Sequence, residues 1–564
     1  MNRNTESHFS NVPNIGISRS KFDRSFTHKT TFNAGDLIPI FCDTTIMPGD
    51  TVKMKMSSVV RMLTPITPVM DNANIDLYFF FVPYRLIWSH FKRFMGENDT
   101  APWAQTTEYK IPQITFPTKT GGGGGVAGWH KGDIADYLGY PTEIGGNDNT
   151  DRGKYHASAL PFRAYCLIWN EFFRDENLQN PVNVNADSDG GSGGTSGTGT
   201  TDWYDPVTHT VNGGKPLKVC KYHDYFTSCL PGAQKGPAVA IPLGSDMTPL
   251  KIGERKPEGA LAEWQTFTNT GDDAALYFNS TDGMTRLTNL DGTDMGLGYS
   301  FNFYTDLSQA TGATVNALRQ CFAIQKFYER QALGGSRYIE MVKAHFNVTN
   351  PDYRVQRPEY LGGKRIPINI NQVIQSTPTN GESTPLGATG AYSLTADVDE
   401  MFTKSFTEHG ILMGLAAIRQ VHTYQQGLNR QYSKESIFDF YFPEFANLGN
   451  QAVLSKELYY GTDESANEEA FGYQEAWACE RYFPDIVTGS MRSNYSGTLD
   501  IWHWADNYSE RPELGDKWIQ ETPENIERTL AIQDEDQFKA DFYFGAVYTR
   551  PMPLYSIPGL IDHH

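Results

Sequence analysis

Two glycine-rich runs have spacings that could support chemistry. Residues 190–194 read Gly-Gly-Ser-Gly-Gly and match Gly-x-Ser-x-Gly, the pattern that presents a nucleophilic serine on a turn between a buried strand and a helix. Polar, low-complexity sequence flanks this run on both sides, and the second run, residues 121–125, lacks the Lys-Ser/Thr pair that completes a phosphate-binding loop. We therefore interpret both runs as connectors and predict no catalytic residue.

Clustered acids and single histidines could hold a metal ion or transfer protons. Glu464, Glu468 and Glu469 lie in an acidic stretch, where a solvated surface is the commoner role of such carboxylates. Oxygen ligands also suit Ca²⁺, so a calcium site within residues 431–541 stays open, with no residue assigned to it and no other cofactor predicted. The histidines lack the spacing of metal ligands, and we expect each to make structural hydrogen bonds: His130, His223, His409, His422 and His503.

Basic and aromatic residues alternate near the N-terminus. Residues 1–30 form a basic arm in which cations are interleaved with Phe9, Phe22 and Phe26; the cations are Arg3, Arg19, Lys21, Arg24 and Lys29. Cations neutralise phosphates, and aromatic rings stack on unpaired bases without reading their sequence. The pattern favours contact with single-stranded DNA, and a disordered polar arm is the alternative.

The composition indicates a β-rich chain with long loops. The 564 residues are 39% hydrophobic and 13% aromatic and include 52 glycines and 31 prolines, which is typical of short strands joined by long connections. The net charge of −19 argues against general nucleic-acid binding, so any such contact must be local. Residues 431–541 hold 23 acids and 8 bases, a net of −15, whereas the basic arm is positive.

The cysteines and the apolar runs indicate the cellular compartment in which the protein is expected. The six cysteines include no Cys-x-x-Cys pair and are few for this length, which indicates free thiols in a reducing cytosol. The N-terminus is polar and lacks the apolar core of a signal peptide. The longest strongly apolar run, Leu77 to Val82, is too short to span a bilayer.

Periodicity predicts strands separated by large insertions. Between residues 52 and 62, apolar side chains alternate with Lys53, Lys55 and Arg61, which predicts a strand with one basic face. The run 75–82 is apolar on both faces and predicts a central strand covered on two sides. Further strands are expected near 411–423 and at 538–548, and helices at 163–175 and, in two pieces broken at Gly334-Gly335, at 315–346.

The C-terminus is apolar but cannot form a helix. Residues 550–564 contain Pro551, Pro553 and Pro558, which restrict the backbone to an extended ribbon. The apolar side chains of this tail need a surface to cover them, and they are Met552, Leu554, Tyr555, Ile557, Leu560 and Ile561. We expect the tail to pack against its own domain or to lie in an interface with a neighbouring copy.

Several segments resemble a single family. They include the C-terminal wording Thr549-Arg-Pro-Met-Pro-Leu-Tyr-Ser-Ile-Pro-Gly and the segments Tyr222-His-Asp-Tyr-Phe-Thr-Ser-Cys-Leu-Pro, Arg357-Pro-Glu-Tyr-Leu-Gly-Gly, Tyr424-Gln-Gln-Gly-Leu-Asn-Arg, Phe471-Gly-Tyr-Gln-Glu and Leu499-Asp-Ile-Trp-His. In order and wording these resemble the major capsid proteins of gokushoviruses, a group of the Microviridae. The resemblance covers most of the chain.

The resemblance and the strand pattern lead to the same fold. Distant strands that must pair across large insertions fit an eight-stranded antiparallel jelly roll with large loop and helix-containing insertions, in a single capsid domain over residues 1–564. The resemblance implies sixty subunits in a T=1 icosahedral shell around circular single-stranded DNA. It also implies a virion protein that assembles in the bacterial host cytoplasm. The expected partners are an internal scaffolding protein, a small DNA-binding protein, a pilot protein and a host surface receptor.

Residues 245–310 match the family poorly and are predicted to form a variable surface insertion. They are rich in Gly, Asp, Thr and Asn and include Trp264, Phe267, Tyr277 and Phe278, a composition suited to an exposed loop with aromatic contacts. In the resembling family an insertion placed like this rises as a protrusion at the threefold axes, which predicts a host-recognition surface. The alternative is a loop that merely decorates the shell.

We interpret the chain as a structural protein without catalytic activity. One rival is a β-rich carbohydrate-active enzyme, suggested by abundant Trp and Tyr, glycine-rich loops and many acids; it would need paired carboxylates in a cleft. Another rival is a receptor-binding spike protein, which would form a trimer without a closed shell.

Overall fold

The chain divides into two compact units. The computed structural model describes residues 18–98, 108–115, 131–142, 156–184, 186–189, 215–239, 315–376 and 386–555, and the backbone of five short strands between residues 251 and 304. The main unit comprises Met1–Ala233 and Gln331–His564, and the inserted unit comprises Gln234–Arg330. Both glycine-rich runs, 121–125 and 190–194, lie outside the described residues.

The first sheet of the main unit is antiparallel and pairs strands from the two ends of the chain. Its order is β1-β20-β4-β16, with β2 also paired to β20, and the strands are β1 (Ser20–Asp23), β2 (Phe26–Phe32), β20 (Phe538–Arg550), β4 (Thr51–Met62) and β16 (Thr395–Ser405). Burial alternates residue by residue along β4 and β20, because one face meets the core and the other meets solvent. The predictions of half-buried strands at 52–62 and 538–548 are confirmed.

The second sheet is antiparallel as well, but it is covered on both faces. Its order is β13-β5-β17-β3, formed by β13 (Glu359–Pro367), β5 (Ala73–Pro83), β17 (Gly410–Gln420) and β3 (Ile38–Ile46). Nearly every side chain of β5 and β17 is buried, as expected for central strands whose sequence is apolar on both faces. The central strand predicted at 75–82 is confirmed.

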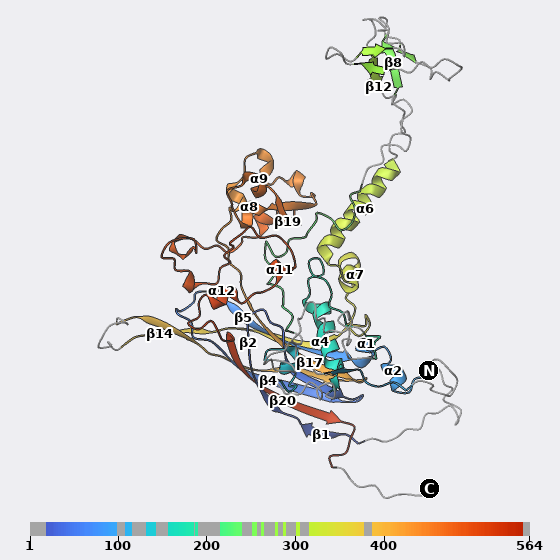
Figure 1. Ribbon diagram of the computed structural model, residues 1–564. Coiled ribbons are helices and arrows are strands. Elements are labelled where there is room, and N and C mark those ends of the chain that lie inside the picture. The colour runs from blue at the N-terminus through green and yellow to red at the C-terminus, as the bar shows by residue number, and fades with distance from the viewer. Residues whose placement is uncertain are drawn as a thin grey trace, which may run out of the picture. The chain divides into compact units, whose positions relative to one another are not determined.

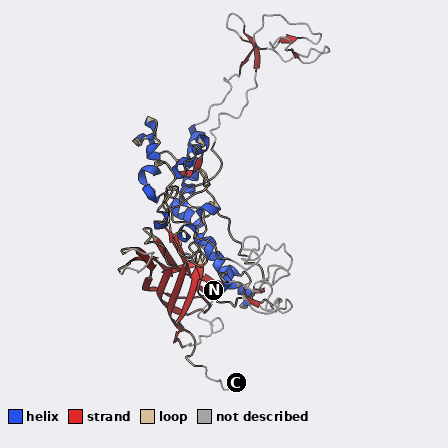
Figure 2. Ribbon diagram, turned by 60° about the vertical axis from the view of Figure 1, so that its left-hand side comes forward, coloured by secondary structure: helices blue, strands red, loops and turns tan. Residues whose placement is uncertain are grey.

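A hydrophobic core fills the space between the two sheets. Val52 and Met54 of β4 and Phe542 of β20 meet Phe79 of β5 and Leu412 of β17, all nearly inaccessible to solvent. Figure 2 shows these strands gathered in one block, with the helices to one side of it. The main unit is therefore a mainly β structure in which two antiparallel sheets form a sandwich.

Helices cover the other face of the second sheet. Phe80, Met413 and Leu415 belong to a second core, separate from the sandwich core, that is built with α1 (Tyr84–Ile87), α4 (Leu160–Ile168) and the π-helical turn η3 (Trp169–Phe173). Figure 1 shows α1 and α4 beside β17. The predicted helix at 163–175 is confirmed, although it begins three residues earlier and its last turn is π-helical.

The remaining elements of the main unit are short. They are α2 (Phe91–Phe94), β6 (Gln113–Thr115), α3 (Ile134–Tyr137), β7 (His156–Ser158), α7 (Tyr338–Phe346), β14 (Ile370–Ile374), β15 (Thr389–Ser393), η5 (Arg430–Tyr432), η6 (Ile437–Asp439), η7 (Pro443–Phe445), β18 (Asn450–Leu454), α8 (Ser455–Leu458), α9 (Glu464–Asn467), β19 (Ala470–Glu475), α10 (Ala478–Arg481), η8 (Gly489–Met491), η9 (Asp500–Trp502), α11 (Asp516–Ile519) and α12 (Glu524–Glu527). A third core, including Phe226, Tyr424 and Trp518, holds the 424–519 region together.

The inserted unit contains five short strands: β8 (Lys251–Arg255), β9 (Leu261–Glu263), β10 (Tyr277–Asn279), β11 (Arg286–Thr288) and β12 (Phe301–Tyr304). They pair in the orders β12-β8-β9 and β10-β11. The predicted insertion 245–310 falls within this unit, with Tyr277 and Phe278 on β10, whereas Trp264 and Phe267 lie outside the described residues.

The helix α6 (Val315–Gly334) begins in the inserted unit and ends in the main unit, where α7 follows after a break. Gly335 at this break has φ +90, a conformation that few other residues adopt. The two-piece helix predicted at 315–346 is confirmed. No helix among the described residues is long and apolar enough to cross a membrane. All six cysteines are free, as predicted.

Candidate nucleic-acid interface and buried polar cluster

The outer face of the first sheet is largely exposed among the residues that the structure describes, and it carries six cations. The alternation of β1, β2, β4 and β20 turns every second side chain away from the core, and this set, which we call the basic face, consists of Lys21, Lys29, Lys53, Lys55, Arg61 and Lys539. Three acids, Asp23, Glu400 and Asp541, face the same way. The face therefore keeps a local positive charge on a chain whose net charge is −19.

Three of the six cations are already paired. Lys29 contacts Asp541 at 3.3 Å, Lys53 contacts Glu400 at 3.0 Å, and Lys539 contacts Glu535 at 3.2 Å. These pairs are solvent-exposed, and such pairs contribute little to stability. Lys21, Lys55 and Arg61 form no ion pair with any residue that the structure describes, so they stay available to an anionic partner.

An aromatic ring lies among these cations. Tyr543 of β20 is 49% exposed and stands opposite Thr27 on one side and Ser57 on the other. Two residues further along β20, Gly545 has no side chain, and a Cβ there would lie 3.5 Å from that of Lys55 and 3.7 Å from the Tyr543 ring. Glycine at this position places no side chain against the edge of the ring. An exposed ring flanked by lysines is the combination that binds unpaired bases and their phosphates.

A groove of about 700 Å³ opens at one end of the basic face. Lys29, Arg61 and Lys539 line its floor, and residues 131–137 form a wall, where the Tyr137 hydroxyl donates to the carbonyl oxygen of Thr31 at 2.9 Å. Its acids are Asp136, Asp536 and Asp541, and Lys131 pairs with Asp536 at 3.1 Å. The volume lies in the range of small-molecule sites and has room for a nucleotide.

The five cations predicted to bind DNA have different surroundings. Lys21 and Lys29 lie on the basic face, Arg19 is exposed just before β1, and Arg3 lies outside the described residues. Arg24 contacts Asp43 at 2.6 Å and lies over the Tyr548 ring, 4.8 Å from its centre, so it is held within the protein. DNA binding by these residues stays a prediction.

Phe22 and Phe26 of the predicted basic arm pack toward the core, although Phe26 stays 43% exposed, and Phe9 lies outside the described residues. Phe22 and Phe26 lie on the inner side of β1 and β2, and the Phe26 ring is 5.2 Å from Phe544 and 5.7 Å from Phe41. Where the structure describes the arm, it consists mostly of paired strands, in place of the disordered alternative. Sequence reasoning did not select Lys539 and Tyr543, although the period-two pattern of 538–548 placed both on the solvent face.

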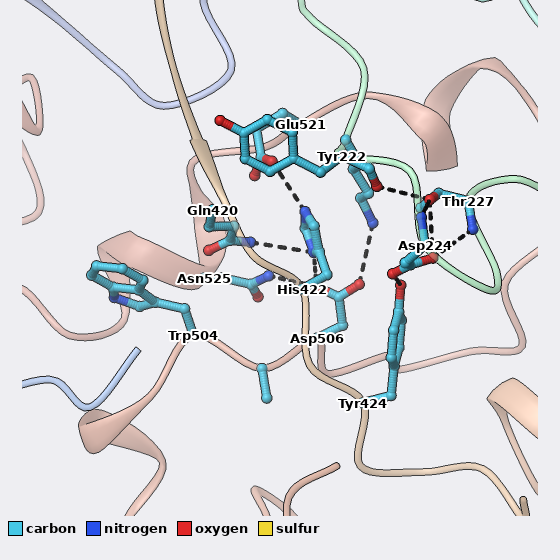
Figure 3. Close-up of polar contacts among 12 residues, drawn as sticks. Tyr222, Asp224, Thr227, Gln420, His422, Tyr424, Trp504, Asp506, Glu521 and Asn525 are labelled. Carbon is cyan, nitrogen blue, oxygen red and sulfur yellow. Dashed lines mark hydrogen bonds and ion pairs between the residues drawn. The ribbon is translucent and has the colours of Figure 1, made fainter. Parts of the chain in front are cut away.

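A buried polar cluster lies just beyond the end of β17. The His422 ring is flanked by two carboxylates, with Nδ1 2.8 Å from Asp506 and Nε2 3.0 Å from Glu521, and each of these side chains is less than 5% exposed (Figure 3). Lys221 contacts Asp506 at 3.2 Å, and the Asn525 amide donates to the same carboxylate at 2.7 Å. Since carboxylates only accept hydrogen bonds, both ring nitrogens must donate, which requires the imidazolium form.

The opposite charges in the cluster stabilise one another and shift the pKa values of their partners. Burial alone would lower the pKa of His422, but Glu521 and Asp506 outweigh it and raise the pKa to about 9. Burial would raise the pKa of Asp506, but His422 and Lys221 hold it well below its usual range. The cluster is thus a fully charged buried network, and removing one member would leave its partners unpaired. His422 makes structural hydrogen bonds, as we predicted.

Three of the segments that carried the family resemblance, those that begin at Tyr222, Tyr424 and Phe471, meet in this region. The Tyr424 hydroxyl donates to Asp224, and Figure 3 shows the two side chains pointing toward each other. The Gln474 amide donates to the carbonyl oxygen of Tyr225 at 3.0 Å, and the Tyr222 hydroxyl donates to Asp76 of β5 at 2.8 Å. These segments therefore hold the 424–519 region together and tie it to the second sheet.

The buried polar cluster does not offer the arrangement that a glycosidase needs. Asp506 and Glu521 flank a histidine instead of an open cleft. A nearby cavity lined by Tyr225, Arg430 and Glu457 holds about 40 Å³, far less than a sugar requires. Glu464, Glu468 and Glu469 are exposed, and Glu468 pairs with Lys456 at 2.6 Å.

The last predicted sites to compare with the structure are the calcium site and the C-terminal tail. Within the ranges that the structure describes, no group of three or more His, Cys, Asp or Glu side chains could hold a metal ion, and the calcium site stays a prediction. Met552, Leu554 and Tyr555 of the tail are exposed, and the role of the tail in a subunit interface stays a prediction. Ile557, Leu560 and Ile561 lie outside the described residues, and so does His130.

A β-sandwich of two antiparallel sheets with large insertions is consistent with the architecture of viral capsid proteins. The chain belongs to the capsid protein (F protein) family, whose family model matches residues 10–560. It is 38% identical to capsid protein VP1 of Chlamydia phage 1, over 98% of this chain and 97% of that protein.

Two further relatives give the same result. The chain is 37% identical to capsid protein VP1 of Bdellovibrio phage phiMH2K, over 99% of this chain and 98% of the relative. It is 36% identical to capsid protein VP1 of Spiroplasma virus 4, over 96% of each. The resemblance to gokushovirus major capsid proteins is thereby confirmed. Membership of this family makes the chain a structural virion component that assembles into a multimeric shell.

Proposed function

We propose that sixty copies of this major capsid protein form a T=1 icosahedral shell around circular single-stranded DNA. The observation that carries the proposal is similarity to capsid proteins over nearly the whole chain. In this proposal the eight strands of a jelly roll are β2, β3, β4, β5, β13, β16, β17 and β20. Strands from both ends of the chain meet in one sheet, which supports such a closed sandwich.

The basic face is the surface that meets the packaged DNA in this proposal. Lys21, Lys55 and Arg61 lack ion-pair partners among the described residues, so phosphates can neutralise them without breaking an existing contact. Tyr543 supplies a ring on which any base can stack. The second sheet could not serve in this way, because helices cover its outer face.

Two further surfaces complete the proposal. The inserted unit is assigned to host attachment, because its strands lie in a segment of aromatic and polar composition. The apolar tail is assigned to contacts between subunits, because its described side chains lie exposed. The internal scaffolding, small DNA-binding and pilot proteins and a host surface receptor are the partners that the family resemblance suggests.

The proposal is tested by expressing the chain with its scaffolding protein and examining the product by electron microscopy. We expect closed particles of uniform size, with packaged single-stranded DNA protected from nuclease when the genome is supplied. Persistent monomers, or trimers that form no closed shell, would overturn it.

The DNA contact is tested on dissociated subunits by replacing Lys21, Lys55 and Arg61 with Ala. Each lost phosphate contact lowers the slope of log affinity against log salt by about 0.7, so the slope should fall by roughly 2. The matched control replaces three exposed lysines elsewhere, Lys92, Lys110 and Lys517, and should leave the slope unchanged. Equal slopes for the two variants would place the DNA elsewhere.

A further inference from the structure

One exposed segment of the main unit is unusually apolar. Residues 435–444, Glu-Ser-Ile-Phe-Asp-Phe-Tyr-Phe-Pro-Glu, are all exposed. Together with Leu448 they form what we call the aromatic surface, whose large apolar side chains are 39% to 71% exposed: Ile437, Phe438, Phe440, Tyr441, Phe442 and Leu448. Exposed apolar clusters of this density mark interaction sites.

Contacts within the subunit fix the conformation of the aromatic surface. The Asp439 carboxylate accepts the backbone N–H groups of Glu435 at 3.0 Å and Ser436 at 2.7 Å. Trp477, which follows β19, donates through its indole N–H to the Phe445 carbonyl oxygen at 3.1 Å, and the Tyr441 ring lies 5.7 Å from the Trp477 ring. A surface fixed in this way loses little conformational entropy on binding.

The charge at the aromatic surface is negative. Residues 435–448 contain Glu435, Asp439 and Glu444 and no Lys or Arg. The neighbouring Lys434 lies over the Phe440 ring, 4.8 Å from its centre, and its charge is paired with Glu480 at 2.5 Å. Two copies of this surface facing each other across a twofold axis would bring like charges together, which disfavours self-pairing. The partner surface should therefore be apolar with a positive charge.

Such a surface exists elsewhere on the same unit. Tyr338 and Phe346 of α7 and Val348 and Tyr353 beyond it are at least half exposed, and we call the exposed side chains of this segment, together with Lys343 and Arg354, the basic apolar surface. Lys343 and Arg354 are exposed and form no ion pair with any described residue.

The remaining charges of residues 338–354 do not alter this balance, because the acids there are paired internally. Glu340 contacts Arg337 at 3.1 Å, and Asp352 contacts Arg357 at 2.9 Å. Arg337 also contacts Glu176 at 2.8 Å, which anchors this surface next to η3. Two unpaired cations thus remain among the exposed apolar side chains.

We propose that the aromatic surface of one copy docks onto the basic apolar surface of a neighbouring copy, an inference that rests on the proposed shell. The contact buries apolar side chains from both surfaces and brings Glu435 and Glu444 of one copy toward Lys343 and Arg354 of the next. Because the two surfaces differ, the contact is head-to-tail and propagates around a symmetry axis until a ring closes.

Charge reversal tests this contact. The first variant carries Glu435→Lys and Glu444→Lys, the second carries Lys343→Glu and Arg354→Glu, and a third combines all four changes. Each of the first two should lower the yield of closed particles at least tenfold, and the combined variant should restore most of it, because the opposite charges meet again with their positions exchanged.

A matched control and a folding check make the result decisive. Glu464→Lys with Glu513→Lys changes two exposed acids elsewhere by the same charge and should leave the particle yield near that of wild type. Thermal unfolding of the dissociated subunits should be unchanged in every variant. Normal particle yield from either single-surface variant, or absence of rescue in the combined variant while wild-type protein assembles, would overturn this interface alone. If wild-type protein forms no particles, the proposed shell fails and the interface fails with it.

Discussion

The two sheets of the sandwich share one core but differ on their outer faces. On the second sheet, Met413 and Leu415 of β17 are buried under α4 and η3. On the first sheet, Lys55 of β4 and Tyr543 of β20 lie in solvent. Among the described residues, the chain's own insertions cover the one face and leave most of the other exposed.

This difference indicates that the two sheets of a capsid subunit can serve different purposes, one stability and the other contact with a partner. The covered sheet is stabilised within the subunit, because both of its faces remove apolar side chains from water. The bare sheet buries only one of its faces and keeps a row of cations on the other. Changes at the two outer faces should therefore affect different properties: stability at the covered face and DNA contact at the bare one.

The largest expected effect comes from placing a charge on each face in turn. Met413→Lys would bury an ammonium group without a partner in the helix-covered core, so we expect loss of more than about 4 kcal/mol of unfolding free energy or failure to fold. Tyr543→Lys on the bare face should cost less than about 1 kcal/mol. Urea unfolding followed by circular dichroism measures both, and similar losses would mean that the faces do not differ as described.

Two neighbouring residues of β20 give a sharper version of the same comparison. Phe542 faces the sandwich core and is fully buried, whereas Tyr543 faces solvent. Phe542→Ala should cost about 3–5 kcal/mol, because it leaves a cavity between the sheets. Tyr543→Ala should change stability by less than about 1 kcal/mol while weakening single-stranded DNA binding. Equal stability losses for the two variants would contradict the alternation.

The sandwich could be predicted from the sequence where hydrophobic periodicity is strong. Alternation in β4 and β20 and the continuous apolar run of β5 gave the half-buried and the doubly covered strands, since each pattern follows directly from which faces meet water. The break between α6 and α7 was readable as well, because it lies at Gly334-Gly335. The π-helical end of α4 was not, since no residue type at 169–173 encodes the extra residue in that turn.

The candidate sites were harder to predict because they depend on pairing between distant strands. Lys53 and Lys55 were predicted to share a basic strand face, but only the register of β4 with β20 shows that Lys55 lies diagonally next to Tyr543. Phe26 was predicted to stack on bases, but the pairing of its strand places the ring against Phe41. Likewise, nothing in the spacing of His422, Asp506 and Glu521, which lie up to 99 residues apart, indicates that they form one cluster.

The smallest of the expected effects concerns the buried cluster beyond the end of β17, which extends the covered sheet's internal contacts into the 503–521 region. The pKa of His422 rises from an unfolded value of 6.5 to about 9 because two carboxylates flank its ring. A folded-state pKa above the unfolded value stabilises the protein fully below pH 6.5, and this contribution is lost as the pH rises through about 9. A shift of this size corresponds to about 3 kcal/mol.

His422→Gln should therefore lower the unfolding free energy by about 3 kcal/mol at pH 6, because the neutral amide leaves the charges of Asp506 and Glu521 without their cationic partner. The difference between wild type and variant should shrink above pH 9, where the wild-type imidazole is neutral as well. The control is His223→Gln, an exposed histidine whose replacement should change stability by less than about 0.5 kcal/mol at either pH. If urea unfolding gave a wild-type advantage that stayed constant from pH 6 to pH 10, His422 would contribute through packing and hydrogen bonds alone, and the charged network would not stabilise this end of the covered sheet.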